Sequence, residues 1–323
     1  MDILITGASG FVGYYVMEAL GKSQTRSQTR SRICIPLADE KGAIDIRDAG
    51  RIKSFLSNSD IPAFDAVIHL AAQGFVPESF KNPLETFDIN FTGTYNLLSA
   101  LKEIGFRGKI LYVSSGDIYG LADESGLPIK EEYPLQPRNP YAVSKVAVEA
   151  LCYQWSVVED MQFIIARPFN HIGPNQSERF VVSSFAKQVI EIELGLRKPA
   201  ISAGNIDVTR DFLDVRDVAG AYKLLLEKET GYDYNINKNI NKFDIFNVCS
   251  EVEVSIRSIL NTMFEITGIE AKIEIDEAKL RTNEQKRICG SNGKLKNYTG
   301  WQPKIPLEQS LEYILNYWKE KLR

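Results

Sequence analysis

The sequence predicts an α/β fold in which a doubly wound parallel sheet carries a smaller α/β lobe. Short apolar runs alternate with amphipathic stretches through the first half of the 323 residues, a glycine-rich turn follows the first run, and the alternation stops after Asn170. Continuous apolar strands separated by helical patterns indicate a parallel sheet covered on both faces. The expected strands of this half are Asp2–Thr6, Ile33–Leu37, Ala66–Leu70, Ile110–Ser114 and Phe163–Arg167.

Amphipathic spacing predicts the helices between these strands. Asn139 is a favoured N-cap residue and Pro140 a favoured first helical residue, so together they predict where the longest helix starts. The expected helices are Val12–Gly21, Ile52–Asn58, Pro83–Gly105 and Pro140–Asp160.

Beyond Asn170 the pattern changes to segments punctuated by Pro and Gly, with further helices expected at Ile256–Thr267 and Leu307–Lys321. A helical pattern at Val215–Leu226 and a strand pattern at Phe243–Cys249 are expected to rejoin the sheet. We therefore expect one domain over 1–169, rejoined by about 211–249, and a smaller lobe over 170–210 and 250–323.

Composition excludes several classes of protein. With 44% hydrophobic residues, 25% charged residues and a net charge of −4, the chain is globular and has no basic excess for nucleic acid. The four cysteines form no C-x-x-C pair, and we expect them to be reduced and buried. The N-terminus lacks a basic leader and no apolar run reaches the ~18 residues of a membrane helix. A cytoplasmic protein without membrane contact is expected.

Gly7, Gly10 and Gly13 form a G-x-x-G-x-x-G turn between the first strand and the first helix. Glycines let the backbone approach a pyrophosphate, whose charge the N–H groups at a helix start stabilise. A tight strand–helix turn is the alternative. The turn favours a Rossmann-like dinucleotide-binding domain, and therefore a substrate-binding role for the smaller lobe.

The segment Ala38-Asp39-Glu40-Lys41 follows the second strand, where NAD and NADP are distinguished. An acid there binds a ribose 2′-OH and a cation accepts a 2′-phosphate, so this mixed segment leaves NADH and NADPH both open. Asp45 could hold the adenine amino group, or be a solvated loop acid.

Tyr141 and Lys145 lie four residues apart on one face of a predicted helix, and Ser114-Ser115 ends the fourth strand. A nearby ammonium and an oxidised nicotinamide can lower the pKa of a phenol, and a serine hydroxyl can orient a reacting carbonyl. The Y-x-x-x-K spacing is common by chance and gains weight from the glycine turn.

The two histidines argue against other chemistries. His69 lies in a strand pattern, which favours a core position, so a Ser-His-Asp hydrolase would depend on His171 alone. There is no G-x-S-x-G elbow either, and we expect neither hydrolytic nor metal-dependent chemistry.

Together these residues resemble the extended short-chain dehydrogenase/reductase family that acts on nucleotide sugars. The resemblance covers nearly the whole chain, through TGASGFVG, HLAAQGFVPESF, INFTGTYNLLSAL, YVSSGDIYG, NPYAVSK, RPFNHIGP, GNIDVTRDFLDVRDVAGAY, FNVCS and TGWQP. It implies that Ser115, Tyr141 and Lys145 are catalytic. The cofactor site implied with it comprises Gly7, Gly10, Phe11, Val12, Gly13, Asp45, Ile46, Leu70, Ala71, Ala72, Tyr141, Lys145 and Pro168.

Within that family, RPFNHIGPNQSERFV and GNIDVTRDFLDV are most similar to the branch of GDP-mannose 4,6-dehydratases and GDP-4-keto-6-deoxy-D-mannose reductases, and closer to the reductases. The resemblance implies that Asn170 contacts the sugar diphosphate, Arg210 and Arg281 its phosphates, and Glu284 the ribose. The full substrate set expected is Asp117, Asn170, Val181, Lys187, Arg210, Arg281 and Glu284. For Arg281 and Glu284, a solvent-exposed position without a substrate contact is a nearly equal alternative.

The dehydratases of this branch have Thr-Asp-Glu or Thr-Ser-Glu where this chain has Ser115-Gly116-Asp117. Elimination of water across C5 and C6 needs a base that reaches C5, and Asp117 is one methylene shorter than Glu. The resemblance therefore favours reduction over dehydration.

The expected activity is NAD(P)H-dependent reduction of the C4 keto group of GDP-4-keto-6-deoxy-D-mannose. Hydride attack on one face gives GDP-D-rhamnose, which the resemblance favours, and attack on the other gives GDP-6-deoxy-D-talose. The alternatives are a nucleotide-sugar 4-epimerase or 4,6-dehydratase, and a catalytically silent cofactor-binding scaffold. The resemblance also implies a homodimer through a four-helix interface, formed by the helices over Pro83–Gly105 and Tyr141–Trp155.

Overall fold

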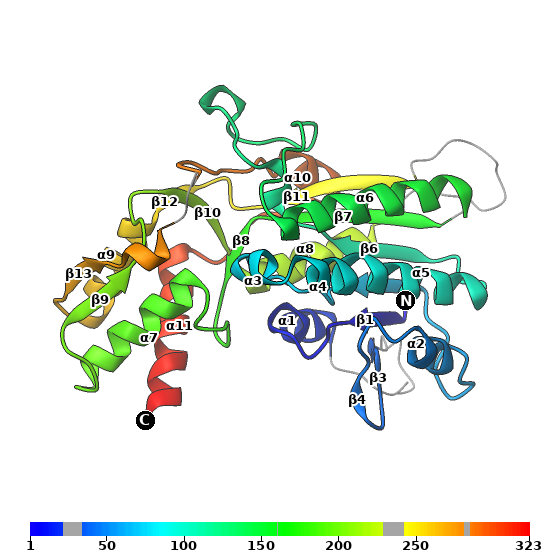
Figure 1. Ribbon diagram of the computed structural model, residues 1–323, viewed down its shortest axis with the longest axis horizontal. Coiled ribbons are helices and arrows are strands. Elements are labelled where there is room, and N and C mark those ends of the chain that lie inside the picture. Colours follow the sequence, from blue (N-terminus) through cyan, green and yellow to red (C-terminus); the bar gives the residue numbers. More distant parts are fainter. Residues whose placement is uncertain (22–33, 160, 229–241, 281–284) are drawn as a thin grey trace.

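The structure of the protein is a computed structural model that describes residues 1–21, 34–159, 161–228, 242–280 and 285–323. Its centre is a six-stranded sheet in the order β11-β7-β6-β5-β1-β2, in which all neighbouring strands are parallel (Figure 1). The strands are β1 (Ile3–Thr6), β2 (Cys34–Pro36), β5 (Ala66–His69), β6 (Lys109–Val113), β7 (Gln162–Pro168) and β11 (Phe243–Val248). The predicted doubly wound sheet is confirmed, including the return of the late strand β11, which pairs with β7 along six residues.

The chain changes direction across the sheet at β1. It runs from β1 to β2 on one side and then crosses to β5 on the other side of β1. Ligands of open α/β sheets bind at such a reversal, outside the carboxyl ends of the strands. The glycine turn that follows β1 lies at this point.

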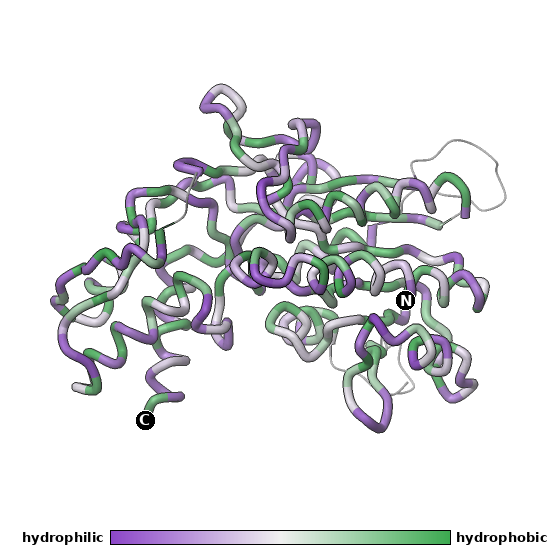
Figure 2. Tube along the Cα trace, viewed as in Figure 1, coloured by the Kyte–Doolittle hydropathy of each residue, from purple (hydrophilic) through white to green (hydrophobic). Residues whose placement is uncertain are grey.

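Helices cover both faces of the sheet because successive strand residues point to opposite sides. Leu4 packs in a core with α2 (Ala49–Leu56), α5 (Gly93–Glu103) and α6 (Pro140–Val158). Ile3 and Ile5 pack in the opposite core, which contains residues of α1 (Phe11–Leu20), α8 (Val215–Glu227) and α10 (Gly293–Thr299). Hydrophobic and hydrophilic residues accordingly alternate along these helices (Figure 2).

The helix predicted over Pro83–Gly105 is present, but a π-helical turn that was not predicted interrupts its α-helical pattern. The structure has α4 (Pro83–Phe87), a π-helical turn over Asp88–Thr92, and then α5, with helical backbone angles at both junctions. Within the π turn the buried Asn90 donates to Ser144 Oγ at 2.9 Å and to the Gln73 carbonyl at 3.1 Å. These bonds tie the turn to α6 and to the loop after β5.

A second group of elements lies to one side of the six-stranded sheet and has a core of its own (Figure 1). The expected helices are confirmed as α9 (Ile256–Thr267) and α11 (Leu307–Leu322). The sequence analysis did not predict the other elements, which are α7 (Val181–Glu193), β8 (Asn170–Ile172), β9 (Ala200–Ala203), β10 (Thr209–Asp214), β12 (Glu253–Ser255) and β13 (Lys272–Ile275). Strand β10 pairs with β8 and β12, and β9 pairs with β13.

No described helix is both long enough and apolar enough to cross a membrane. The four cysteines are free and buried, as expected.

Candidate active site

The turn after β1 brings the backbone into close contact with its neighbours. Gly7 has a φ of 70°, and a Cβ atom there would lie 2.8 Å from the backbone nitrogen of Ala71. A Cβ atom at Gly13 would lie 2.2 Å from the carbonyl oxygen of Gly7. Helix α1 starts at Phe11, which Val12 follows. Its N-cap residue is Gly10, and no side chain accepts a hydrogen bond from its first N–H groups. Its first N–H groups are therefore available to an anion.

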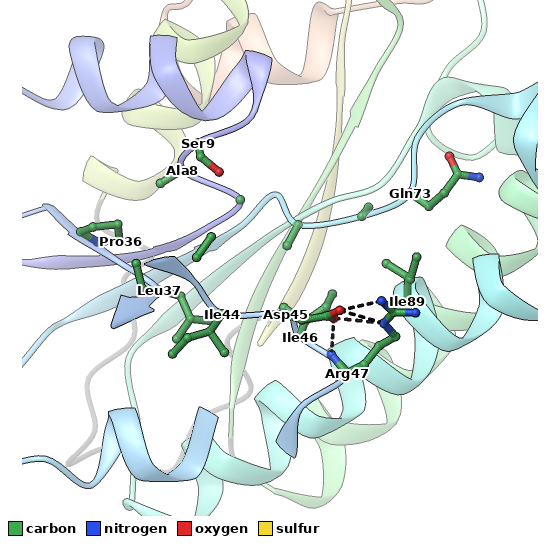
Figure 3. A pocket seen from close by; sticks show the side chains of 15 residues that line it. Ala8, Ser9, Pro36, Leu37, Ile44, Asp45, Ile46, Arg47, Gln73 and Ile89 are labelled. Carbon is green, nitrogen blue, oxygen red and sulfur yellow. Dashed lines mark hydrogen bonds and ion pairs between the residues drawn. The ribbon is translucent and has the colours of Figure 1, made fainter. Parts of the chain in front are cut away.

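A pocket of about 430 Å³ opens beside this turn (Figure 3). Gly7, Asp45, Ile46, Ala71 and Ala72 of the predicted cofactor set line it. Its other lining residues are Ala8, Ser9, Pro36, Leu37, Ala38, Ala43, Ile44, Arg47, Gln73 and Ile89. A mostly apolar wall with a few polar groups, next to an uncapped helix start, fits the adenosine end of a dinucleotide. The remaining predicted cofactor residues, Gly10, Phe11, Val12, Gly13, Leu70, Tyr141, Lys145 and Pro168, do not line this pocket.

One polar group of the pocket wall is the Asp45 carboxylate, which is paired with Arg47 at 2.6 Å (Figure 3). The side-chain hydrogen bond from Arg47 lowers the pKa of Asp45, so this group is an acceptor at neutral pH. Arg47 also lies 3.5 Å from Glu85. The sequence analysis did not identify Arg47 as a pocket residue, although its position two residues after Asp45 indicates a place in the same wall.

The segment that could distinguish the two cofactors forms a small hairpin of β3 (Ala38–Asp39) and β4 (Gly42–Ala43). Asp39 pairs with Arg51 of α2 at 2.6 Å, and the hydrogen bond from Arg51 lowers the pKa of Asp39. Among residues 38–41 only Ala38 lines the pocket.

The structure brings Ser115, Tyr141 and Lys145 together. Ser115 caps a short 3₁₀ turn over Gly116–Tyr119 that follows β6, and the effect of its side chain is to lower the pKa of Tyr141. Tyr141 is the second residue of α6, so Lys145 lies one turn further along the same face. The Lys145 Nζ donates to the Val113 carbonyl at 2.8 Å and lies 5.8 Å from the centre of the Tyr141 ring.

Burial dominates the electrostatics of these groups. It raises the pKa of Tyr141 to about 12, against a lowering effect of the Ser115 hydrogen bond. Burial also lowers the pKa of Lys145 to about 7, while the Coulombic effect of Glu149, one turn further along α6, raises it. The phenol is therefore a proton donor in this state, and the charge of Lys145 is poised near neutral pH.

Asn139, the N-cap of α6, makes two different hydrogen bonds. Its Oδ1 accepts from the Ala142 N–H at 2.8 Å, and its Nδ2 donates to Asp117 Oδ2 at 2.6 Å. The Asp117 N–H donates in turn to Ser115 Oγ at 3.1 Å. Asp117 was predicted to bind substrate, and the structure places it within two residues of Ser115 and in contact with the start of the Tyr141 helix.

Two of the predicted substrate residues lie on neighbouring strands. Asn170 is exposed at the start of β8 and is paired in register with Phe212 of β10, the strand that carries Arg210. The Arg210 guanidinium donates to the carbonyl oxygens of Thr209 and Gln285, at 2.7 and 2.8 Å. The structure therefore places Asn170 and Arg210 on adjacent strands.

The other predicted substrate residues are more scattered. Val181 begins α7 and is exposed, whereas Lys187 lies further along that helix and is paired with Glu178. Arg281 and Glu284 lie outside the described residues.

His171 is a site neighbour that the sequence analysis left without a role. Its ring stacks on Phe11 at the start of α1, with centroids 6.1 Å apart and an interplanar angle of 11°. Its Nδ1 lies 3.2 Å from the Phe169 carbonyl, which only a protonated Nδ1 can satisfy. The position next to Asn170 was the one sequence signal that could have identified it.

His69 is a core residue, as predicted from its strand pattern. It is 2% exposed, and its ring nitrogens contact Thr6 Oγ1 at 2.6 Å and Thr94 Oγ1 at 2.8 Å. Burial lowers its pKa to about 3, so the ring is neutral. The side chain links β1, β5 and α5 behind the glycine turn.

The doubly wound sheet, the glycine turn and the Ser-Tyr-Lys cluster define an extended short-chain dehydrogenase/reductase. The family model described as GDP-mannose 4,6 dehydratase matches residues 4–314. This chain therefore belongs to the GDP-mannose 4,6-dehydratase family, which confirms the resemblance inferred from its motifs.

The relatives include both reductases and epimerases. GDP-6-deoxy-D-mannose reductase of Pseudomonas aeruginosa is 42% identical over 322 residues, covering 99% of this chain and 98% of that protein. The solved structure of RMD from P. aeruginosa complexed with NADPH has a TM-score of 0.86 and 41% identity, covering 99% of each chain. UDP-glucose 4-epimerase of Thermus thermophilus, in complex with NAD, has a TM-score of 0.80 and 25% identity, again covering 99% of each chain.

Proposed function

We propose that this protein is an NAD(P)H-dependent reductase that converts GDP-4-keto-6-deoxy-D-mannose to GDP-6-deoxy-D-mannose, which is GDP-D-rhamnose. The observation that carries the proposal is the 42% identity with GDP-6-deoxy-D-mannose reductase along nearly the full length of both proteins. The cluster of Ser115, Tyr141 and Lys145 supports it, because carbonyl reduction needs a proton donor and a group that orients the carbonyl.

In this proposal each member of the cluster has a separate task. A bound reduced nicotinamide supplies the hydride that C4 accepts. Tyr141 donates its phenolic proton to the oxygen at C4, and Ser115 holds that oxygen by a hydrogen bond. Lys145 stabilises the phenolate that remains. The pocket beside Gly7 would hold the adenosine end, and NADPH is the favoured cofactor because it occupies the RMD structure.

The test is the NMR spectrum of the sugar made from GDP-mannose by the purified protein, a GDP-mannose 4,6-dehydratase and NADPH, with NADH in a parallel reaction. We expect GDP-6-deoxy-D-mannose. An unreduced 4-keto sugar would overturn the proposed reaction, and GDP-6-deoxy-D-talose would overturn its stereochemistry. Product formed without consumption of reduced cofactor would favour the epimerase instead.

The pH dependence of kcat/KM for the nicotinamide cofactor is expected to follow Lys145. Its ammonium is present below its pKa of about 7 and is lost above it, whereas the phenol of Tyr141, with a pKa of about 12, keeps its proton. kcat/KM, which reports the free enzyme, should therefore fall as the pH rises through the titration of Lys145. In Lys145→Arg the cation persists, so this decline should disappear from the profile. A flat wild-type profile up to pH ~9 would contradict the assignment.

We propose that the nucleotide sugar binds between two parts of the chain, 1–169 with about 211–249, and 170–210 with 250–323. The separate core of the second part supports this division. We also propose a cytoplasmic location, which the four free, buried cysteines support.

We further propose a homodimer in which the helical segment over Pro83–Glu103, which contains α4 and α5, and the helix α6 of each copy form a four-helix interface. Large hydrophobic side chains are exposed on these helices, including Leu84 (84%), Tyr95 (48%), Tyr153 (58%) and Val157 (66%). Exposed apolar side chains gathered on a few helices are typical of an interface, and closed pairs are the commonest assemblies.

Light scattering of the wild-type chain should give twice the 36.4 kDa monomer mass. Leu84→Asp combined with Val157→Asp should give the monomer mass, because two charges would be buried at the interface. Leu196→Asp, at a residue of similar exposure (65%) outside these helices, is the matched control and should stay dimeric. A monomeric wild type would contradict the proposal.

A further inference from the structure

Asn139 joins two elements that reach the site by different routes. The turn that carries Ser115 and Asp117 follows β6, whereas Tyr141 lies on α6, the helix that leads to β7. The Asn139 Oδ1 caps α6 through Ala142, and its Nδ2 holds the Asp117 carboxylate at 2.6 Å. One side chain thus links the start of the helix to the turn.

These contacts form a continuous path from the start of the Tyr141 helix to Ser115. From Asn139 the path runs to the Asp117 carboxylate and through the Asp117 N–H to Ser115 Oγ at 3.1 Å. Tyr141 is two residues from Asn139 at the start of α6. The path therefore restrains the position of Ser115 relative to Tyr141.

We propose that Asn139 is a positioning residue for the reduction, acting through Asp117 to hold Ser115 at the Tyr141 hydroxyl. The contact is a hydrogen bond to a carboxylate, which is stronger than one between neutral groups. A small displacement of reacting groups can cost about 10²-fold in rate, so this restraint has a large effect on kcat. The inference rests on the proposed function for its catalytic consequence and on the structure for the restraint itself.

A role limited to capping the helix makes different predictions. Ser and Asp are N-cap residues as good as Asn, so Asn139→Ser and Asn139→Asp both keep the cap of α6. Ser is too short to reach Asp117, and Asp places a second carboxylate against it. Combining Asn139→Asp with Asp117→Asn restores the pair with donor and acceptor exchanged. If Asn139 only capped α6, the effect of substituting it would not depend on the residue at position 117.

The experiment compares the wild type, Asn139→Ser, Asn139→Asp and the exchanged double variant by kcat, KM and Tm. We expect kcat to fall about 10-fold or more in Asn139→Ser and further in Asn139→Asp, with KM for the sugar within about twofold and Tm nearly unchanged. Asp117 belongs to the expected substrate set, so the exchanged variant is compared with Asp117→Asn alone. Asn139→Asp should lower kcat in the wild type but not in the Asp117→Asn background, because the two sites are coupled. Wild-type kcat in Asn139→Ser, or an equal loss from Asn139→Asp in both backgrounds, would overturn the proposal.

A second measurement separates failure of this inference from failure of the proposed function. The ¹³Cζ resonance of Tyr141, assigned by its absence in Tyr141→Phe, senses the position of the Ser115 side chain near its hydroxyl without any substrate. It should shift in Asn139→Asp and return in the exchanged variant. If the wild type does not reduce the GDP-linked keto sugar, the proposed function fails. The resonance still shows whether Asn139 restrains Ser115 relative to Tyr141. An unchanged resonance in Asn139→Asp would overturn the inference.

Discussion

Replacing Tyr141 with Phe is expected to lower kcat for C4 reduction by about 10²–10⁴-fold, the usual contribution of a positioned general acid. The change removes the hydroxyl and leaves the ring in place. Burial raises the pKa of Tyr141 to about 12, so the lost group is the protonated phenol that would supply the proton. Binding of GDP should stay near the wild-type level, because the phenol acts at C4 of the sugar, and NADPH should keep its contacts in the adenosine pocket beside Gly7, which does not include Tyr141.

Steady-state kinetics with isothermal titration of NADPH measure both parts of this prediction. Tyr153→Phe is the matched control, since Tyr153 lies on the same helix with 58% of its surface exposed. Its kcat should equal that of the wild type. Turnover by Tyr141→Phe within a few-fold of the wild type would remove Tyr141 from the chemistry.

Arg167→Met is expected to destabilise the protein by about 3–5 kcal/mol, because it leaves a buried carboxylate without a partner. The side chains of Arg167 and Glu149 are only 3% and 6% exposed and lie 2.6 Å apart. Arg167 also donates to the Tyr119 hydroxyl at 2.8 Å and to the Glu131 carbonyl at 3.0 Å. Its loss therefore disrupts a network between α6, β7 and the segments that follow β6.

Chemical denaturation measures this effect, and two further variants identify its cause. Adding Glu149→Met to Arg167→Met should recover part of the stability, since the uncompensated charge disappears. Lys53→Met removes an exposed pair with Glu103, 47% and 55% exposed, and should change the free energy of unfolding little. A near-wild-type midpoint for Arg167→Met would show that the network does not contribute to stability.

The sheet and its cofactor turn could be predicted because their signals are local. Each sheet strand is a short apolar run, and Gly7 and Gly13 are required by contacts within one strand–turn–helix unit. The π turn over Asp88–Thr92 could not be predicted, because it depends on bonds from Asn90 to the distant Ser144 and Gln73. Strand β10 was missed for a similar reason. Its charged Asp211 is fully buried only because the backbone N–H groups of Ser250, Glu251 and Gly290 reach it.

The candidate site likewise contains residues that local signals predict and contacts that depend on distant parts of the chain. Tyr141 and Lys145 follow from their spacing on one helix, whereas the choice of Ser115 over Ser114 comes from the family resemblance. The bond between Asn139 and Asp117 spans 22 residues and two elements, so no periodicity reveals it. The ion pair of Lys187 with Glu178 also depends on tertiary placement, and it gives a predicted substrate residue a partner within the protein.

The position of β11 at the edge of the sheet has a consequence for biosynthesis. Strand β7 ends at Pro168, and its partner β11 ends at Val248, roughly 80 residues later. At about 5–20 residues per second, the ribosome needs on the order of 4–16 s to deliver that partner. For that interval β7 has an unpaired apolar edge in the nascent chain. Chaperones bind surfaces of this type, and such an edge can pair with another chain and start aggregation.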